Sequence, residues 1–263
     1  MSLKGRPRQE LGLTPGLRGE IVHATIMRWD QGGRREDIGA IFEREFEAQT
    51  RDLTGVHESH SAKKMRAAML ADLRSFELSE RARRETYRTE VDPAFVERDF
   101  VLPFTLADGT TVELRGRVDR VELRGDIGLA VDFKYSAEAY KGKKLDEALT
   151  QEYQVAAYLL ALQHWGLRPA GMEFQNLRGD TRRVGVLDVS LTREVLRGKA
   201  PKNTVPRVAA EVMDEGIQRM AAVASSIRAG VIEVKPRNTK RCKVGPGGCD
   251  FYDLCRIPKW TLS

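Results

Sequence analysis

The feature that most limits how this chain can fold is a stretch of alternating apolar and polar residues between positions 98 and 135. A period of two residues fits a β-strand and does not fit a helix. Turn-forming residues interrupt the stretch at positions 107–109 and again at Gly125-Asp126. The pattern therefore predicts a three-stranded antiparallel meander that begins at about Arg98.

Helical periodicity lies on both sides of this meander. It covers residues 17–30, 34–53, 61–76, 145–165 and 206–229, and two further strands are expected near 171–176 and 183–191. These elements predict an α/β fold in which a small mixed sheet is flanked by helices. We expect one domain over residues 1–263, made of a helical part (17–97), a catalytic sheet and helix (98–192), and a C-terminal helix with a cysteine-containing loop (193–263).

The turn at Gly125-Asp126 fixes how the second and third strands pair, because a two-residue hairpin turn that begins with glycine sets one register. In that register Asp119 lies opposite Asp132, with Cβ atoms about 5 Å apart, where like charges destabilise a sheet. A divalent cation such as Mg²⁺ accounts for the pair, since hard cations bind carboxylate oxygens. A slip by one residue would turn Asp119 to the opposite face.

Lys134 shares the face of Asp132, because side chains two residues apart in a strand point the same way. Two acids and a lysine suit phosphodiester hydrolysis without a covalent nucleophile. The metal polarises the phosphate and lowers the pKa of a water, and the ammonium orients that water or neutralises developing charge. The alternative is a partly exposed strand with ordinary surface acids and a lysine, and an isolated Asp-x-Lys does not distinguish the two.

Four segments, in this order, resemble motifs of the RecB-like (AddB-type) branch of the PD-(D/E)xK nuclease superfamily. They are GEIVH at 19–23, GRVDRV at 116–121, VDFK at 131–134 and QVAAY at 154–158. The resemblance covers nearly the whole chain. It implies a restriction-endonuclease-like fold and a DNA nuclease, most often an exonuclease, that uses Mg²⁺ or Mn²⁺ and acts in DNA repair, recombination or end processing.

The same resemblance assigns candidate site residues. His23, Asp119 and Asp132 are the implied metal ligands, the carbonyl of Phe133 adds a backbone ligand, and Asp119, Asp132 and Lys134 form the catalytic set. For His23 the alternative is a packed core histidine, which is the commoner role of a lone histidine on an apolar helix.

Further residues are implied around this set. Glu97 is a candidate acidic neighbour of the site. Gln151, Gln154 and Tyr158 lie on one helix edge and are candidates for DNA binding, through hydrogen bonds to phosphate or stacking on a base. The alternative is a helix edge packed on the sheet with Tyr158 half buried.

All three cysteines, Cys242, Cys249 and Cys255, lie near the C-terminal end of the sequence. This tail resembles that of the iron–sulfur members of the family, which bind a 4Fe-4S cluster with four cysteines. The gap between the first two cysteines is longer here and no upstream cysteine is present, so the ligand set is incomplete. Four readings stay open: the fourth cysteine lies just upstream of this sequence, the cluster is lost, the three cysteines bind zinc with a histidine, or they are reduced thiols.

DNA is the expected partner, and a net charge of +6 is compatible with a polyanion without proving one. Relatives are often joined to helicases, and the short segment before the first motif suits a domain of a larger protein. No apolar run reaches the roughly 20 residues that span a bilayer, so we expect a cytoplasmic protein with no membrane partner. The rivals are an inactive DNA-binding or scaffold module, an iron–sulfur or zinc structural module, and restriction-type cleavage.

Overall fold

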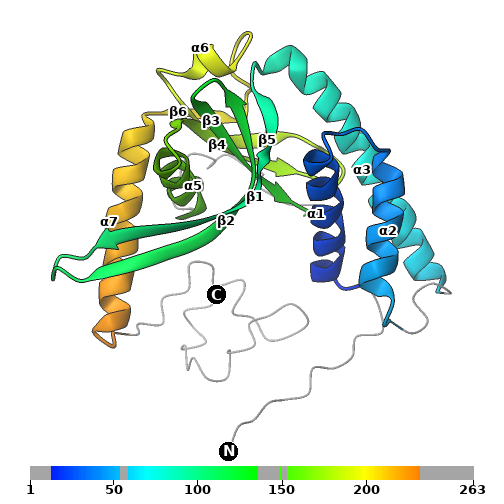
Figure 1. Ribbon diagram of the computed structural model, residues 1–263, viewed down its shortest axis with the longest axis horizontal. Helices are drawn as coiled ribbons and strands as arrows, with labels where there is room; N and C mark the ends of the chain where they lie inside the picture. Colours follow the sequence, from blue (N-terminus) through cyan, green and yellow to red (C-terminus); the bar gives the residue numbers. More distant parts are fainter. Residues whose placement is uncertain (1–12, 54–58, 136–148, 150–152, 232–263) are drawn as a thin grey trace, which may run out of the picture.

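The computed structural model describes residues 13–53, 59–135, 149 and 153–231, which form a six-stranded mixed sheet with helices on both faces (Figure 1). The strands are neighbours in chain order: β1 (Glu90–Thr105), β2 (Thr111–Arg124), β3 (Ile127–Lys134), β4 (Arg168–Asn176), β5 (Arg183–Asp188) and β6 (Thr204–Arg207). The pairs β3/β4 and β5/β6 are parallel and the others are antiparallel. The predicted α/β fold with a small mixed sheet is confirmed.

Two groups of helices cover the sheet. On one side lie α1 (Pro15–Gln31), α2 (Ile38–Thr50) and α3 (His60–Thr86), whose buried residues pack with Val131 and Phe133 of β3. On the other lie α5 (Tyr153–His164) and α7 (Ala209–Arg228), which pack with Ala130 and its neighbours. The chain passes through α5 between β3 and β4, since a parallel pair needs a crossover.

Among the described helices, none is long and apolar enough to cross a membrane.

Local sequence explains where key helices begin and meet. Thr14 caps α1 by accepting a hydrogen bond from the Leu17 amide at 3.1 Å, and Pro15 occupies the first turn, where its missing N–H costs nothing. Helices α5 and α7 approach closely at Gly216, where a Cβ atom would lie 2.1 Å from the Cβ of Ala156. Only glycine permits that approach.

The predicted meander is present in the expected register. Arg124 pairs with Ile127 and Arg120 pairs with Val131, so the turn is Gly125-Asp126, and Gly125 has φ of 61°. Continued by one residue, this register places Asp119 opposite Asp132.

Several boundaries differ from the prediction. Helix α3 continues to Thr86, beyond residue 76, and β1 begins at Glu90 and not at Arg98. The alternation in β1 is hidden by a register shift between Val91 and Val96. Short elements with too few residues to show a period were missed, namely β6 and helix α6 (Thr192–Val195). The cysteine tail lies outside the described residues.

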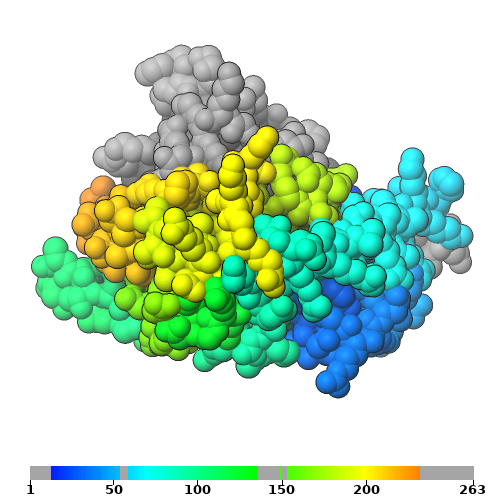
Figure 2. All heavy atoms as spheres, turned by 90° about the horizontal axis from the view of Figure 1, so that it is seen from above, coloured from blue at the N-terminus to red at the C-terminus, as the bar shows by residue number. Residues whose placement is uncertain are grey.

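The α6 region lies against the C-terminal end of α3, as the adjoining yellow and cyan segments in Figure 2 show. The amide of Arg88 donates to the Val195 carbonyl at 2.7 Å, and the amide of Arg197 donates to the Thr86 carbonyl at 2.8 Å. These bonds fix the loop between α3 and β1 to a segment about a hundred residues later in the chain.

A network of buried charges joins the α1–α3 layer to the sheet. The guanidinium of Arg120 is fully buried and bonds to Asp30 of α1 at 3.2 Å, Glu80 of α3 at 3.2 Å and Glu122 of β2 at 2.8 Å. Burial alone would raise the pKa of Glu122, but the charges of Arg183 and its neighbouring arginines lower that pKa to about 2. Glu122 is therefore ionised, and its charge depends on these arginines.

Replacing Arg120 with leucine is expected to lower the free energy of unfolding by about 3–5 kcal/mol, because it leaves buried carboxylates without a counter-charge. Arg115→Leu is the matched control: Arg115 lies on the same strand but is largely exposed, and its ion-pair partner among the described residues is Glu113. Its loss should cost less than about 1 kcal/mol. Urea unfolding of both variants measures the difference, and equal losses would contradict the role given to Arg120.

Candidate metal centre

Three carboxylates stand in a row across three neighbouring strands. Glu97 lies in β1 between the paired residues Val96 and Arg98, at the position that faces Asp119 in β2. Asp119 in turn faces Asp132 in β3, at the next step of the β2–β3 register. Adjacent acids on one sheet face repel one another, so a positive charge beside this row would stabilise it.

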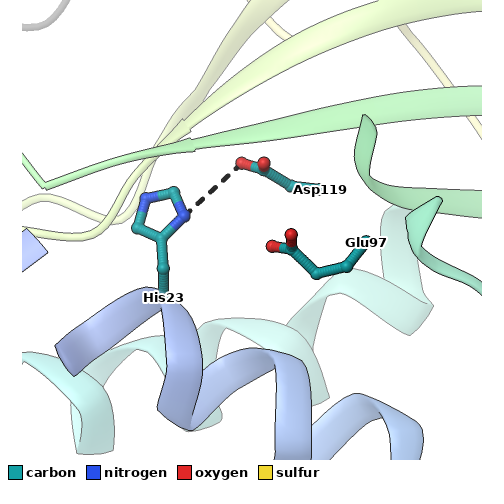
Figure 3. A group of neighbouring side chains, drawn as sticks. All are labelled: His23, Glu97 and Asp119. Carbon is teal, nitrogen blue, oxygen red and sulfur yellow. Dashed lines mark ion pairs between the residues drawn. The ribbon is translucent and has the colours of Figure 1, made fainter. Parts of the chain in front are cut away.

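Helix α1 brings His23 to this row (Figure 3). Its Nδ1 atom is 3.7 Å from Oδ2 of Asp119. One ligand atom each from His23, Glu97 and Asp119 lie within 4.8 Å of one another. These residues line a cavity of about 570 Å³, whose wall on α1 includes Gly19 and Glu20.

The backbone at Glu97 is strained. Its φ is 53°, a left-handed conformation that costs a non-glycine residue on the order of 1–3 kcal/mol. The position follows directly on the register shift in β1, and such irregularities re-aim side chains. Here the carboxylate of Glu97 is turned towards Asp119 and His23 (Figure 3).

Asp132 is held by three neighbours. Nζ of Lys134 lies 2.6 Å from its Oδ2 atom, while Oδ1 accepts hydrogen bonds from the Tyr158 hydroxyl at 3.0 Å and the Gln154 amide at 3.3 Å. Gln154 also accepts a hydrogen bond from Lys134 Nζ at 3.2 Å. Oδ2 of Asp132 is buried and makes no hydrogen bond, so its contact with Lys134 is an ion pair alone.

Burial and mutual repulsion perturb the acids of the row. Burial first, and the charge of Asp132 second, raise the pKa of Asp119 to about 8, although Asp119 accepts a hydrogen bond from the Phe133 amide at 2.7 Å. Burial also raises the pKa of Glu97, and it lowers the pKa of His23. The imidazole is thus neutral and able to act as a ligand.

These residues fit a divalent metal ion. Carboxylate oxygens and a neutral imidazole are donors that Mg²⁺ and Mn²⁺ accept. The buried Oδ2 atom of Asp132 has no hydrogen-bond donor, and the raised pKa of Asp119 shows that a second negative charge is not accommodated without a cation.

The structure brings most of the predicted site residues together. His23, Asp119, Asp132 and Lys134 converge, and the Phe133 carbonyl lies near enough to His23 to stabilise the protonated imidazole, which raises its pKa against the effect of burial. Glu97 belongs to the group itself. Sequence reasoning did not place it opposite Asp119, because the irregularity in β1 hid the register of that strand.

The two described candidates for DNA binding, Gln154 and Tyr158, both donate hydrogen bonds to Asp132. Tyr158 is 5% exposed, and its hydroxyl donates to Asp132. Gln154 bridges Asp132 and Lys134. Both residues therefore hold Asp132 and Lys134 in place, a role that residue types alone did not indicate, and their direct contact with DNA stays a prediction. Gln151 lies outside the described residues.

Comparison with known proteins gives one family match. Residues 2–256 match the family model of the PD-(D/E)XK nuclease superfamily. No curated protein matches the chain. Among solved structures, a crystal structure of SSO0001 is similar at 13% sequence identity and a TM-score of 0.38, over 91% of this chain and 84% of that chain. A TM-score this low carries no argument about function.

Metal affinity is expected to rise with pH up to about 8 and then level off, because Asp119 must lose a proton to bind a cation and its pKa is raised to about 8. The gain is about tenfold per pH unit while Asp119 is mostly protonated. Titration with Mn²⁺ in two buffers of different ionisation enthalpy measures both the affinity and the released proton. Affinity that does not change between pH 6 and pH 8 would contradict this coupling.

Substituting Glu97 with glycine is expected to act in opposite directions on stability and on metal binding. Glycine adopts a φ of 53° without strain, so the free energy of unfolding should rise by about 1 kcal/mol. Mn²⁺ affinity should fall about tenfold or more, since a ligand is lost. Glu20→Gln, in the same cavity wall but outside the ligand group, should change neither quantity, and a Glu97→Gly variant that binds Mn²⁺ as well as wild type refutes the assignment.

Proposed function

Because this chain belongs to the PD-(D/E)XK nuclease superfamily, we propose that it is a nuclease that hydrolyses DNA phosphodiester bonds with Mg²⁺ or Mn²⁺. The observation that carries the proposal is the pairing of Asp119 with Asp132 across two strands, with Lys134 on the same face. A module that only binds DNA has no need for two facing acids and a lysine held at 2.6 Å from one of them.

The metal would be held by His23, Asp119 and Asp132, with the Phe133 carbonyl as a backbone ligand and Glu97 as an additional carboxylate. When bound, a divalent cation supplies Lewis acidity that polarises the phosphate and lowers the pKa of a water.

Lys134 has the position of the group that orients the attacking water. Its side chain is 31% exposed, and Gln154 and Asp132 fix the direction of its ammonium group. From there it donates hydrogen bonds to the water or to a phosphoryl oxygen as negative charge develops. Tyr158, whose pKa is raised by burial and by the charge of Asp132, stays protonated and donates a hydrogen bond to Asp132.

We further propose exonucleolytic action in the repair or processing of DNA ends, in the cytoplasm and together with a helicase or other domains of a larger protein. The order of the four motifs supports this RecB-like assignment. The cysteines Cys242, Cys249 and Cys255 remain candidates for an iron–sulfur or zinc site.

Incubation with end-labelled single- and double-stranded DNA and Mg²⁺ or Mn²⁺ tests the activity. We expect cleavage that EDTA abolishes and that falls at least about a hundredfold in Asp119→Asn and Lys134→Met. Glu113→Gln is the matched control, since Glu113 is an exposed acid on the same strand as Asp119 and should cut at the wild-type rate.

The pattern of products separates exonuclease from endonuclease action, because only an end-directed enzyme leaves covalently closed circles intact. Binding of DNA without any cleavage would favour the inactive scaffold instead. Cleavage that survives in both site variants would place the active site elsewhere.

A further inference from the structure

The row of acids at the metal centre holds more negative than positive charge. Glu97, Asp119 and Asp132 form the row, and Lys134 forms an ion pair with the last of them. A DNA strand adds a negative charge at every nucleotide. During phosphodiester hydrolysis the reacting phosphate gains further negative charge as water attacks it. A second side-chain cation at this row would therefore favour both the binding and the cleavage of DNA.

Arg117 is fixed beside this row through its backbone. It lies on β2, two residues before Asp119. Its carbonyl oxygen is 2.9 Å from the Tyr158 hydroxyl, and the same hydroxyl is 3.0 Å from Oδ1 of Asp132. One buried hydroxyl thus joins the main chain at Arg117 to an acid of the row, so Arg117 is held at the metal centre.

The side chain of Arg117 reaches the same row. Asp99, its partner in the β1–β2 register, accepts hydrogen bonds from Nε at 2.7 Å and from Nη2 at 3.2 Å. This paired contact fixes the plane of the guanidinium group. The third nitrogen, Nη1, lies 3.5 Å from Oε2 of Glu97, whose carboxylate is turned towards His23 and Asp119 (Figure 3). The guanidinium therefore contacts a candidate metal ligand.

Nη1 keeps its donors for another acceptor. A distance of 3.5 Å is longer than an ordinary N–H···O hydrogen bond of about 2.7–3.2 Å, and Nη1 has no second partner in the described part of the chain. The side chain of Arg117 is 55% exposed, so a ligand can reach it from solution. Its contact with Asp99 is an exposed ion pair, which contributes little to stability. These properties favour a contact with substrate over a purely structural role.

We propose that Arg117 binds the phosphate of the DNA strand that enters the metal centre, with Nη1 donating to a non-bridging phosphate oxygen. This inference rests on the proposed nuclease function and adds a residue that contacts the substrate. Asp99 already holds the guanidinium in one orientation, so little side-chain freedom is lost when DNA binds. Because a guanidinium group recognises phosphate oxygens and not bases, Arg117 contributes affinity for any sequence.

The test compares Arg117→Gln and Arg117→Lys with Arg115→Gln. Arg115 is the matched control, because it lies on the same strand, is 73% exposed and pairs with an exposed acid, Glu113. Binding of a labelled single-stranded oligonucleotide is followed by fluorescence anisotropy in Ca²⁺, across a series of salt concentrations. Cleavage in Mg²⁺ or Mn²⁺, Mn²⁺ affinity without DNA and the melting temperature are measured in parallel.

Arg117→Gln should bind DNA about tenfold more weakly, which is the effect of losing one hydrogen bond to a charged group. The slope of log K against log salt should become shallower by about 0.7. The value of kcat/KM should fall about a hundredfold, since the lost donor faces the phosphate on which charge develops. Arg117→Lys keeps the charge and should keep the wild-type salt slope. Arg115→Gln should match wild type, and no variant should change the melting temperature.

Mn²⁺ affinity separates substrate binding from a role in holding Glu97. Arg117→Gln should bind Mn²⁺ at least as tightly as wild type, because a positive charge beside a cation site opposes the metal. A variant that loses Mn²⁺ affinity together with DNA affinity would show that Arg117 acts only through Glu97, and would overturn the substrate contact.

Wild-type cleavage, together with an Arg117→Gln variant that binds and cuts DNA like Arg115→Gln, would overturn the role of Arg117 and leave the nuclease proposal intact. A wild-type protein that neither binds nor cuts DNA would overturn both proposals.

Discussion

The buried guanidinium of Arg120 is the interaction on which the arrangement of layers depends. It bonds to acids from α1, α3 and β2, and its guanidinium carbon lies 4.9 Å from the centre of the Phe133 ring in β3. Each of these bonds is made inside the protein, where an unpaired charge is far more costly than in water. Because a packed core does not deform continuously, the network permits one position of α1 against the sheet.

That position determines the metal centre. Asp30, which Arg120 holds, lies two turns after His23 on the same helix, and Arg120 is the neighbour of Asp119 in β2. One residue thus fixes both the helix that offers the imidazole and the strand that offers the central carboxylate. The 3.7 Å between His23 and Asp119 follows from this connection.

The parts of the fold and of the metal centre that could be predicted from the sequence are those with a local sequence pattern. The Gly125-Asp126 turn fixed the β2–β3 register, so the facing of Asp119 and Asp132 followed from counting residues. Glu97 could not be placed in the same way, since β1 is irregular and its backbone is left-handed at that position. The bonds of Tyr158 and Gln154 to Asp132 depend on how α5 packs on the sheet, which no local pattern encodes.

Adjacent residues of β2 illustrate two solutions to the same electrostatic problem. On one face, the acids around Arg120 are balanced by buried arginines, which lower the pKa of Glu122 to about 2. On the other, Asp119 is half-buried beside Asp132 with only Lys134 to offset them, and its pKa rises to about 8. The cluster around Arg120 has buried arginines as counter-charges, whereas the cluster around Asp119 and Asp132 has only Lys134. The uncompensated cluster lies at a cavity and includes a neutral histidine, so the charge that balances it is one that arrives from solution.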